Sequence, residues 1–194
     1  MEIRTLDFYN KNAEEYASKT FKTDMSDSCD RFLKHVAPGG KILDLGCGSG
    51  RDSVYFMEHG YEVCAVDGSE ELCRIASENT GLQVRQMLFQ ELDYAGEFDG
   101  VWACASLLHV PGDDLPDVLA KVYGSLKDGG VFYTCFKYGE SEEIRDGKYY
   151  TDMTEERIEL LLHESGFEIL ELYVTGDSLG DRPELRWVNV IGLK

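Results

Sequence analysis

A short apolar run followed by a glycine-rich loop constrains the fold of this chain more than any other feature. Residues 41–45 read KILDL, and the loop GCGSG places glycine at positions 46, 48 and 50. An apolar run of this length is typical of a buried strand. Glycines directly after it let the backbone turn sharply and pass close to a ligand, because no Cβ is in the way. Open α/β sheets bind ligands at the carboxyl ends of their strands, so we expect a ligand site at this loop.

Strand and helix patterns alternate along the rest of the chain, as an α/β sheet requires. Further strands are predicted from apolar runs, at residues 61–66, 83–88, 98–104 and 129–136. Helices are predicted from apolar positions at helical spacing, at residues 51–59, after a cap at Ser69, at 115–126 and at 154–166. The acidic pair at 142–143 is interpreted as the solvated face of a helix.

The last two predicted strands, residues 167–175 and 185–193, are separated by little more than GDSLGDRP. A parallel crossover needs a dozen or more residues, so these strands should form an antiparallel hairpin. We therefore expect a Rossmann-like, doubly wound α/β fold. Its sheet is seven-stranded and mostly parallel, with an antiparallel C-terminal hairpin and helices on both faces.

The length of 194 residues predicts a single domain spanning residues 1–194. Residues 1–40 have helical spacing and are expected to form a lid over a core at residues 41–194. The chain has 37 acidic and 19 basic residues, a net charge of −18, which disfavours nucleic acid as a partner. We expect a monomer or homodimer.

Two further absences in the sequence bear on location. No leader pattern and no long apolar run is present, so no membrane span is expected. The six cysteines include no C-x-x-C pair, which favours reduced core cysteines in a cytoplasmic protein and no metal site.

Two acidic residues indicate which ligand the loop binds. Dinucleotide sites need a third glycine at position 51, where this chain has Arg51. Asp44 lies two residues before Gly46, and its carboxylate suits a cationic amino group and sits badly beside a pyrophosphate. Asp67 follows Asp44 by 23 residues at the end of the next strand, where a carboxylate can accept ribose hydroxyl protons. That second feature is shared with NAD sites, so it indicates a nucleoside without identifying it.

The segments LDLGCGSG, VDGS and FDGVWACASLLHVP together resemble the class I S-adenosylmethionine-dependent methyltransferases, over nearly the whole chain. Within that class the chain is similar to small bacterial methyltransferases grouped with tellurite-resistance proteins, which implies a small-molecule acceptor. The implied cofactor is S-adenosyl-L-methionine, with S-adenosyl-L-homocysteine as the product.

The resemblance implies a cofactor role for residues in three segments. The methionine part would be lined by Asp44, Gly46, Cys47 and Gly48. The nucleoside would be held by Asp67, Gly68 and Ser69, with Leu88 and Phe89 forming an adenine slot. Cys104 and Ala105 would lie under the transferred methyl. The family often has an acid where this chain has Leu88 and Phe89, so a backbone carbonyl or Glu91 would replace it. Arg51 would bind the cofactor carboxylate or form a structural salt bridge.

Candidate acceptor residues follow from the same resemblance. His109 is the candidate general base, since the pKa of histidine is ordinarily near neutral; a packing histidine is the alternative. Tyr9 and Tyr16 would cover the pocket with aromatic faces or simply pack between helices. Other pocket walls are expected from Ser106, Phe136 and Tyr138, with Lys137, Tyr149 and Tyr150 beside them.

The expected function is methyl transfer to a small molecule. Two alternatives stay open: a non-catalytic S-adenosylmethionine-binding module and, less favoured because of Arg51 and Asp44, an NAD-binding oxidoreductase. An RNA methyltransferase is disfavoured by the net charge, and no additional recognition domain is expected for either an RNA or a protein substrate.

Overall fold

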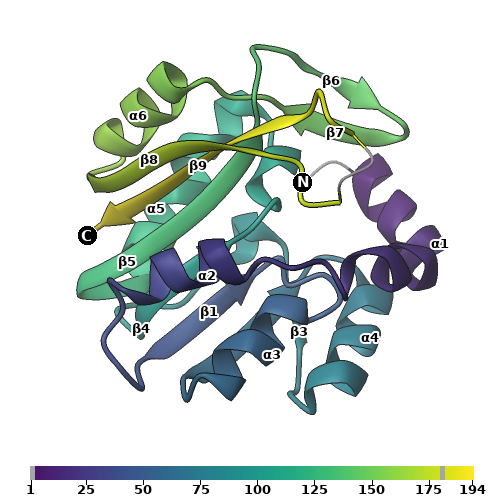
Figure 1. Cartoon of the computed structure of the whole chain (residues 1–194), viewed down its shortest axis with the longest axis horizontal. Helices are drawn as coiled ribbons and strands as arrows, with labels where there is room; N and C mark the ends of the chain where they lie inside the picture. Colours follow the sequence, from purple (N-terminus) through teal and green to yellow (C-terminus); the bar gives the residue numbers. More distant parts are fainter. Residues whose placement is uncertain (1–2, 180–181) are drawn as a thin grey trace.

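The computed structural model describes residues 3–179 and 182–194 and shows a seven-stranded sheet in the order β3-β2-β1-β4-β5-β9-β8 (Figure 1). Strands β1 to β5 are parallel, and β9 runs antiparallel to both β5 and β8. The strands are β1 (Lys41–Leu45), β2 (Glu62–Asp67), β3 (Arg85–Gln86), β4 (Phe98–Ala103), β5 (Leu126–Lys137), β8 (Glu168–Gly176) and β9 (Arg186–Leu193). The predicted fold class and the C-terminal hairpin are confirmed; Gly180 and Asp181 of the hairpin loop lie outside the described residues.

Helices cover both faces of the sheet, as predicted. In Figure 1, α2 and α3 lie in front of the strands and α5 lies behind them. The helices are α1 (Ile3–Thr20), α2 (Ser26–Leu33), α3 (Arg51–Glu58), α4 (Glu70–Thr80), α5 (Leu115–Ser125) and α6 (Glu155–Glu164). Ser69 caps α4, its hydroxyl accepting from the Leu72 N–H at 3.2 Å. In the part of the chain that the structure describes, no helix combines the length and apolarity needed to cross a bilayer.

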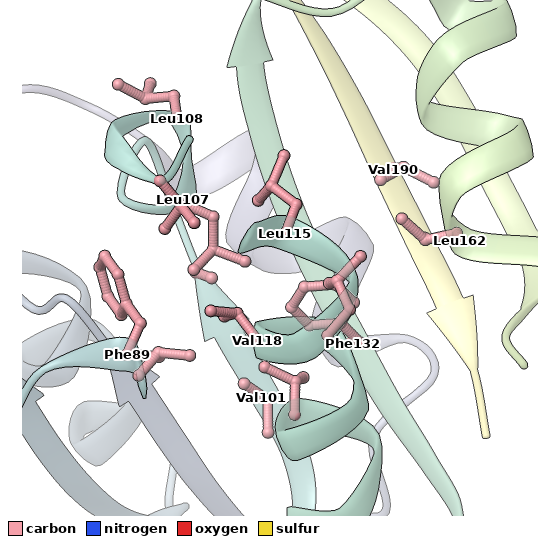
Figure 2. Packing of buried hydrophobic residues seen from close by; sticks show 14 of the residues in the cluster. Phe89, Val101, Leu107, Leu108, Leu115, Val118, Phe132, Leu162 and Val190 are labelled. Carbon is pink, nitrogen blue, oxygen red and sulfur yellow. The ribbon is translucent and has the colours of Figure 1, made fainter. Parts of the chain in front are cut away.

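Two apolar cores hold these layers together. On one face, Leu115 and Val118 of α5 lie against Val101 and Phe132 of the sheet (Figure 2). On the other face, Phe32 of α2 and Phe56 of α3 pack on Trp102 of β4. The central strands are buried on both sides, which explains why their sequences are continuous apolar runs rather than alternating ones.

The structure corrects three predicted elements. The strand expected at 83–88 is only two residues long, and both of these residues are exposed at the edge of the sheet. The fifth strand begins at Leu126 rather than 129, directly after α5. The acidic pair at 142–143 is not helical: it lies in β6 (Glu142–Arg145), which pairs with β7 (Lys148–Thr151) in a separate antiparallel hairpin.

Gly100 offers a direct test of this packing. A Cβ at Gly100 would lie 2.7 Å from Cζ of the buried Phe32 ring. We expect Gly100→Ala to lower the free energy of unfolding by about 1–3 kcal/mol, because the ring must shift within a close-packed core. The control is Gly124→Ala on α5, where a Cβ meets open space. It should raise stability by about 0.5–1 kcal/mol. Equal effects of the two substitutions in urea unfolding would contradict the assigned packing.

Candidate functional site

The glycine loop lies at the carboxyl end of β1, between β2 and β4. Gly46 has φ +82°, and a Cβ there would lie only 2.5 Å from Cβ of Ser106. Ser106 is buried, and its hydroxyl donates to the Leu45 carbonyl at 2.7 Å. Gly46 therefore lets the chain after β4 pack against the loop. Ser106 is part of that packing and does not line the cavity described below, contrary to the predicted acceptor role.

Asp67 binds the loop to the next strand. Its two carboxylate oxygens accept hydrogen bonds from the N–H of Gly48 at 2.9 Å and of Ser69 at 2.8 Å. Burial raises the pKa of Asp67, and these backbone donors partly offset that effect. Each carboxylate oxygen has two lone pairs. Asp67 therefore keeps acceptor capacity for the hydroxyls of a ligand while it holds the loop.

Asp44 is a buried carboxylate with few partners. It is 2% exposed, and it accepts a hydrogen bond from the Ser53 hydroxyl at 2.6 Å. Burial, followed by the negative charge of Asp52, raises the pKa of Asp44 to about 7. A cation placed beside Asp44 would offset both effects. The arrangement therefore fits a ligand with a positively charged amino group.

Arg51 forms the structural salt bridge that was one of its two predicted roles. Its guanidinium donates to Asp52 at 2.6 and 2.8 Å, and Asp52 also accepts from Nε1 of Trp102 at 2.8 Å. Arg51 also lines the cavity described below. Contact between Arg51 and a ligand carboxylate stays a prediction.

A cavity of about 650 Å³, a size suited to a small molecule, is lined by Arg51 directly after the loop, but not by Asp44, Asp67 or the loop glycines. It is bounded by α1, the chain after β4, the end of β5, β7 and the β8–β9 loop. Predicted residues that it brings together are Tyr9, Tyr16, Arg51, Cys104, Ala105 and His109. The Sγ atoms of Cys104 and Cys135 lie 4.0 Å apart on its wall, and all six cysteines are free thiols.

Two predicted wall residues at the end of β5 lie elsewhere. Phe136 is 1% exposed and packs in the main core, and Tyr138 lies outside the cavity under the Arg186 guanidinium. Side chains alternate along a strand, so Lys137 faces the cavity instead. Tyr150 also lines the cavity, as expected.

The predicted adenine slot is only partly exposed. Phe89 is 1% exposed within the core, so its ring is not available as a slot wall, whereas Leu88 is half-buried. The Glu91 carboxylate, a candidate replacement for the missing acid, already accepts from the Leu88 N–H at 2.9 Å. Gly68 directs its carbonyl to the Gln86 side chain, and the Cys47 side chain packs away from the cavity, with Ala65 and Ala76.

His109 is held by hydrogen bonds at both ring nitrogens. Its Nδ1 lies 2.6 Å from the Tyr149 carbonyl, which can only accept, so Nδ1 carries the proton. Its Nε2 must then accept from the Tyr9 hydroxyl at 2.8 Å. Burial lowers the pKa of His109 to about 3. His109 is therefore neutral near pH 7, and its lone pair is engaged by Tyr9.

Helix α1 covers the loop and closes one side of the cavity. Ala13 and Ala17 pack against Leu72 and Ile75 of α4. Figure 1 shows α1 lying between α4 and the β6–β7 hairpin. The contact carries a hydrogen bond, because the Ser69 hydroxyl donates to the Asn10 side chain at 2.7 Å.

Lys148 is a cavity residue that the sequence analysis missed. It begins β7, in the hairpin that was not predicted. The signal that could have found it is Asp146-Gly147: both have positive φ, as the central residues of a two-residue hairpin turn require.

Residues 42–130 match the family described as a methyltransferase domain. An uncharacterised methyltransferase of Staphylococcus carnosus is 28% identical over 115 residues, 58% of this chain and 56% of the relative. A ubiquinone biosynthesis O-methyltransferase of Xanthomonas axonopodis is 34% identical over 102 residues, 49% of this chain and 42% of the relative. The chain spans about half the length of the curated relatives it matches.

Among solved structures, the 1,6-didemethyltoxoflavin-N1-methyltransferase of Burkholderia thailandensis, with bound 1,6-didemethyltoxoflavin and S-adenosylhomocysteine, superposes with a TM-score of 0.82. It is 22% identical, with 98% of this chain and 87% of that chain covered, and this likeness shows the fold. The sequence matches over residues 42–130, the sheet order and the acid-flanked glycine loop agree, and together they support the resemblance to the class I S-adenosylmethionine-dependent methyltransferases.

Proposed function

We propose that this protein transfers a methyl group from S-adenosylmethionine to a small molecule held in the cavity beside the glycine loop. The observation that carries the proposal is the pair of buried carboxylates, Asp44 and Asp67, at the ends of β1 and β2 on either side of the loop. Asp44 suits an amino group and its charge opposes a pyrophosphate, and Asp67 suits a ribose diol. The small-molecule ligand of the Burkholderia relative supports the acceptor class.

The residues of this chain would bind and orient the two reactants. S-adenosylmethionine supplies, when bound, a methyl group already activated on a sulfonium. Asp44 would hold its amino group and Asp67 its ribose. Arg51, Cys104 and Ala105 lie on the wall that joins the loop to the cavity. Alignment of reactants in such a site lowers a barrier by about 7–11 kcal/mol.

The proton-transfer role proposed for His109 has a structural condition. Because Nε2 accepts from Tyr9, His109 could take a proton only after the Tyr9 hydroxyl moves or relays it. We therefore assign His109 first as a positioning residue for Tyr9. An acceptor that arrives deprotonated needs no base at all.

We propose that residues 1–40 act as a lid, since α1 covers the loop, and that residues 41–194 form the core of one domain. A cytoplasmic location, assembly as a monomer or homodimer and the absence of a nucleic-acid partner stay predictions.

Calorimetric titration with S-adenosylhomocysteine tests the cofactor assignment. We expect binding of this compound and none of NAD(H). Asp67→Ala should weaken binding by more than about tenfold, because a buried hydrogen-bonding carboxylate is lost. The control is Asp99→Ala at the opposite end of the sheet, where the carboxylate accepts from the Lys41 N–H at 2.8 Å and from Lys127 at 2.7 Å. It should leave the affinity unchanged. Binding of NAD(H) alone would favour the oxidoreductase alternative.

Methyl transfer itself is tested by mass spectrometry of S-adenosylhomocysteine formed with panels of small-molecule acceptors. Turnover with a member of the panel supports the enzyme. Tight binding of S-adenosylmethionine without turnover across oxygen, nitrogen and sulfur nucleophiles would favour the non-catalytic module.

The raised pKa of Asp44 predicts a pH dependence of binding. A cationic amino group favours the ionised carboxylate, so binding expels the proton that Asp44 carries below about pH 7. The affinity for S-adenosylhomocysteine should rise by up to about tenfold per pH unit below this value and level off above it. Asp44→Asn should weaken binding and flatten the profile. An unchanged profile in this variant, with Asp99→Ala as control, would exclude Asp44 as the titrating group.

The assigned state of His109 is tested by NMR. Its ring proton resonances should not shift between about pH 8 and pH 5, because burial keeps the imidazole neutral. Tyr9→Phe removes the donor to Nε2 and should raise the pKa of His109, whereas Tyr16→Phe should not. Titration of His109 near its ordinary pKa in the unaltered protein would restore it as a candidate general base.

A further inference from the structure

One end of the cavity is basic although the chain has a net charge of −18. Lys137 at the end of β5 and Lys148 at the start of β7 both line the cavity, and both are half-buried. They come from strands of two different sheets, so the hairpin is what brings the second ammonium group to the first. Two like charges in a partly desolvated site repel each other, so their charged forms are disfavoured unless an anion lies between or beside them.

Both ammonium groups lie around one aromatic ring. Nζ of Lys137 is 3.7 Å from the centre of the Tyr150 ring, and Nζ of Lys148 is 5.8 Å from it. Lys148 is also 4.4 Å from the centre of the Phe8 ring on α1. Contact with a ring face offsets part of the desolvation of a cation and leaves its N–H donors available.

Neither lysine has a carboxylate partner among the described residues. No ion pair within 4.0 Å there includes Lys137 or Lys148. Burial, followed by the charges of Arg145, Lys148 and Arg182, lowers the pKa of Lys137 to about 8, and burial lowers that of Lys148.

Acidic residues around the two lysines mostly form ion pairs and hydrogen bonds with other groups. Asp152 binds Arg145 at 2.5 Å. Asp177 accepts from the Arg182 guanidinium at 3.0 Å and from Nε1 of Trp187 at 3.0 Å. Asp146, at the exposed hairpin turn, favours the charged form of Lys148 without forming an ion pair with it within 4.0 Å. Positive charge is therefore in excess around Lys137 and Lys148; the lining acids Glu15, Asp24 and Asp27 belong to α1, α2 and the segment between them.

The basic end lies close to the residues assigned to the acceptor. The Tyr150 ring is 4.9 Å from the His109 ring, which in turn binds Tyr9. The lining of the same cavity includes Arg51, directly after the glycine loop, and Cys104 and Ala105, after β4. A small molecule in the cavity can therefore contact these residues and the two lysines.

We propose that Lys137 and Lys148 bind an oxyanionic group, a carboxylate or a phosphate, of the methyl acceptor. The acceptor is on this basis an anionic small molecule, an inference that rests on the proposed function. The two ammonium groups supply charge-assisted hydrogen bonds, and the surrounding rings exclude water from one side of the bound group. Bound anion in turn relieves the repulsion between the two lysines.

The test uses the full chain saturated with S-adenosylhomocysteine, titrated separately with inorganic phosphate and with acetate and followed by backbone amide NMR. Amide shifts are expected around positions 137 and 148–150. Lys137→Gln and Lys148→Gln should each lower the affinity for the anion by about tenfold. Lys148→Arg, which keeps the charge, should retain most of the affinity. A preference for one anion identifies the headgroup as carboxylate or phosphate.

Lys19→Gln is the matched control, because Lys19 lines the outer part of the same cavity, is 66% exposed and pairs with Glu15. It should leave anion affinity unchanged, and all variants should keep the melting temperature and the affinity for S-adenosylhomocysteine. No saturable shift with either anion, or equal weakening in Lys19→Gln, would overturn the inference. Anion binding at the two lysines in a chain that does not bind S-adenosylhomocysteine would overturn the proposed function and leave the anion site standing.

Discussion

The carboxylate of Asp67 is the interaction on which the architecture of the site depends. Its two oxygens accept from the N–H of Gly48 in the loop and of Ser69 at the start of α4. One side chain at the end of β2 therefore fixes both the loop that follows β1 and the helix that α1 packs on. A change in Asp67 alters the loop, the helix N-terminus and the contact with α1 together. The loop is consequently preformed, and little conformational entropy remains to be lost there when a ligand binds.

The distribution of charge gives the site a polarity. Asp44 and Asp67 are buried beside the loop, and Asp52, also buried, is balanced by Arg51. Lys137 and Lys148 line the cavity, whereas Asp44 and Asp67 do not. A cationic group is favoured beside the two acids and an anionic group beside the two lysines. Two groups of opposite charge can thus be distinguished by their position in the site.

Much of the fold could be predicted from the sequence because β1, β4 and β5 are buried on both faces and so appear as continuous apolar runs. The β6–β7 hairpin was missed because it is a two-stranded ribbon rich in charged residues, and its acidic positions were interpreted as a helix. Its Asp146-Gly147 turn was the available signal. Asp44 and Asp67 lie at the ends of the strands that the sequence predicts, and both are buried beside the glycines; their roles toward a ligand stay predictions.

Other parts of the site depend on tertiary contacts that spacing does not reveal. The sequence could not show whether Phe136 or Lys137 faces the cavity, because the phase of a strand buried on both faces is not marked by alternation. The role of Gly46 depends on Ser106, which is 60 residues away in sequence and comes from the loop after another strand. His109 has an ordinary titration range in isolation, and only the Tyr149 carbonyl, the Tyr9 hydroxyl and burial give it a single tautomer and a low pKa.

Helix α1 contacts both the glycine loop and the wall of the cavity. Toward the loop it packs on α4 and places Tyr16 beside Gly48. Toward the basic end it binds His109 through Tyr9, and its buried Thr5 accepts from the Tyr149 N–H at 3.0 Å. Backbone angles at Asn12 are non-helical, so α1 consists of two helical segments. The first segment carries Thr5, Tyr9 and Asn10, and the second carries Tyr16 and Ala17. One helix therefore contributes contacts both at the loop and at the wall of the cavity.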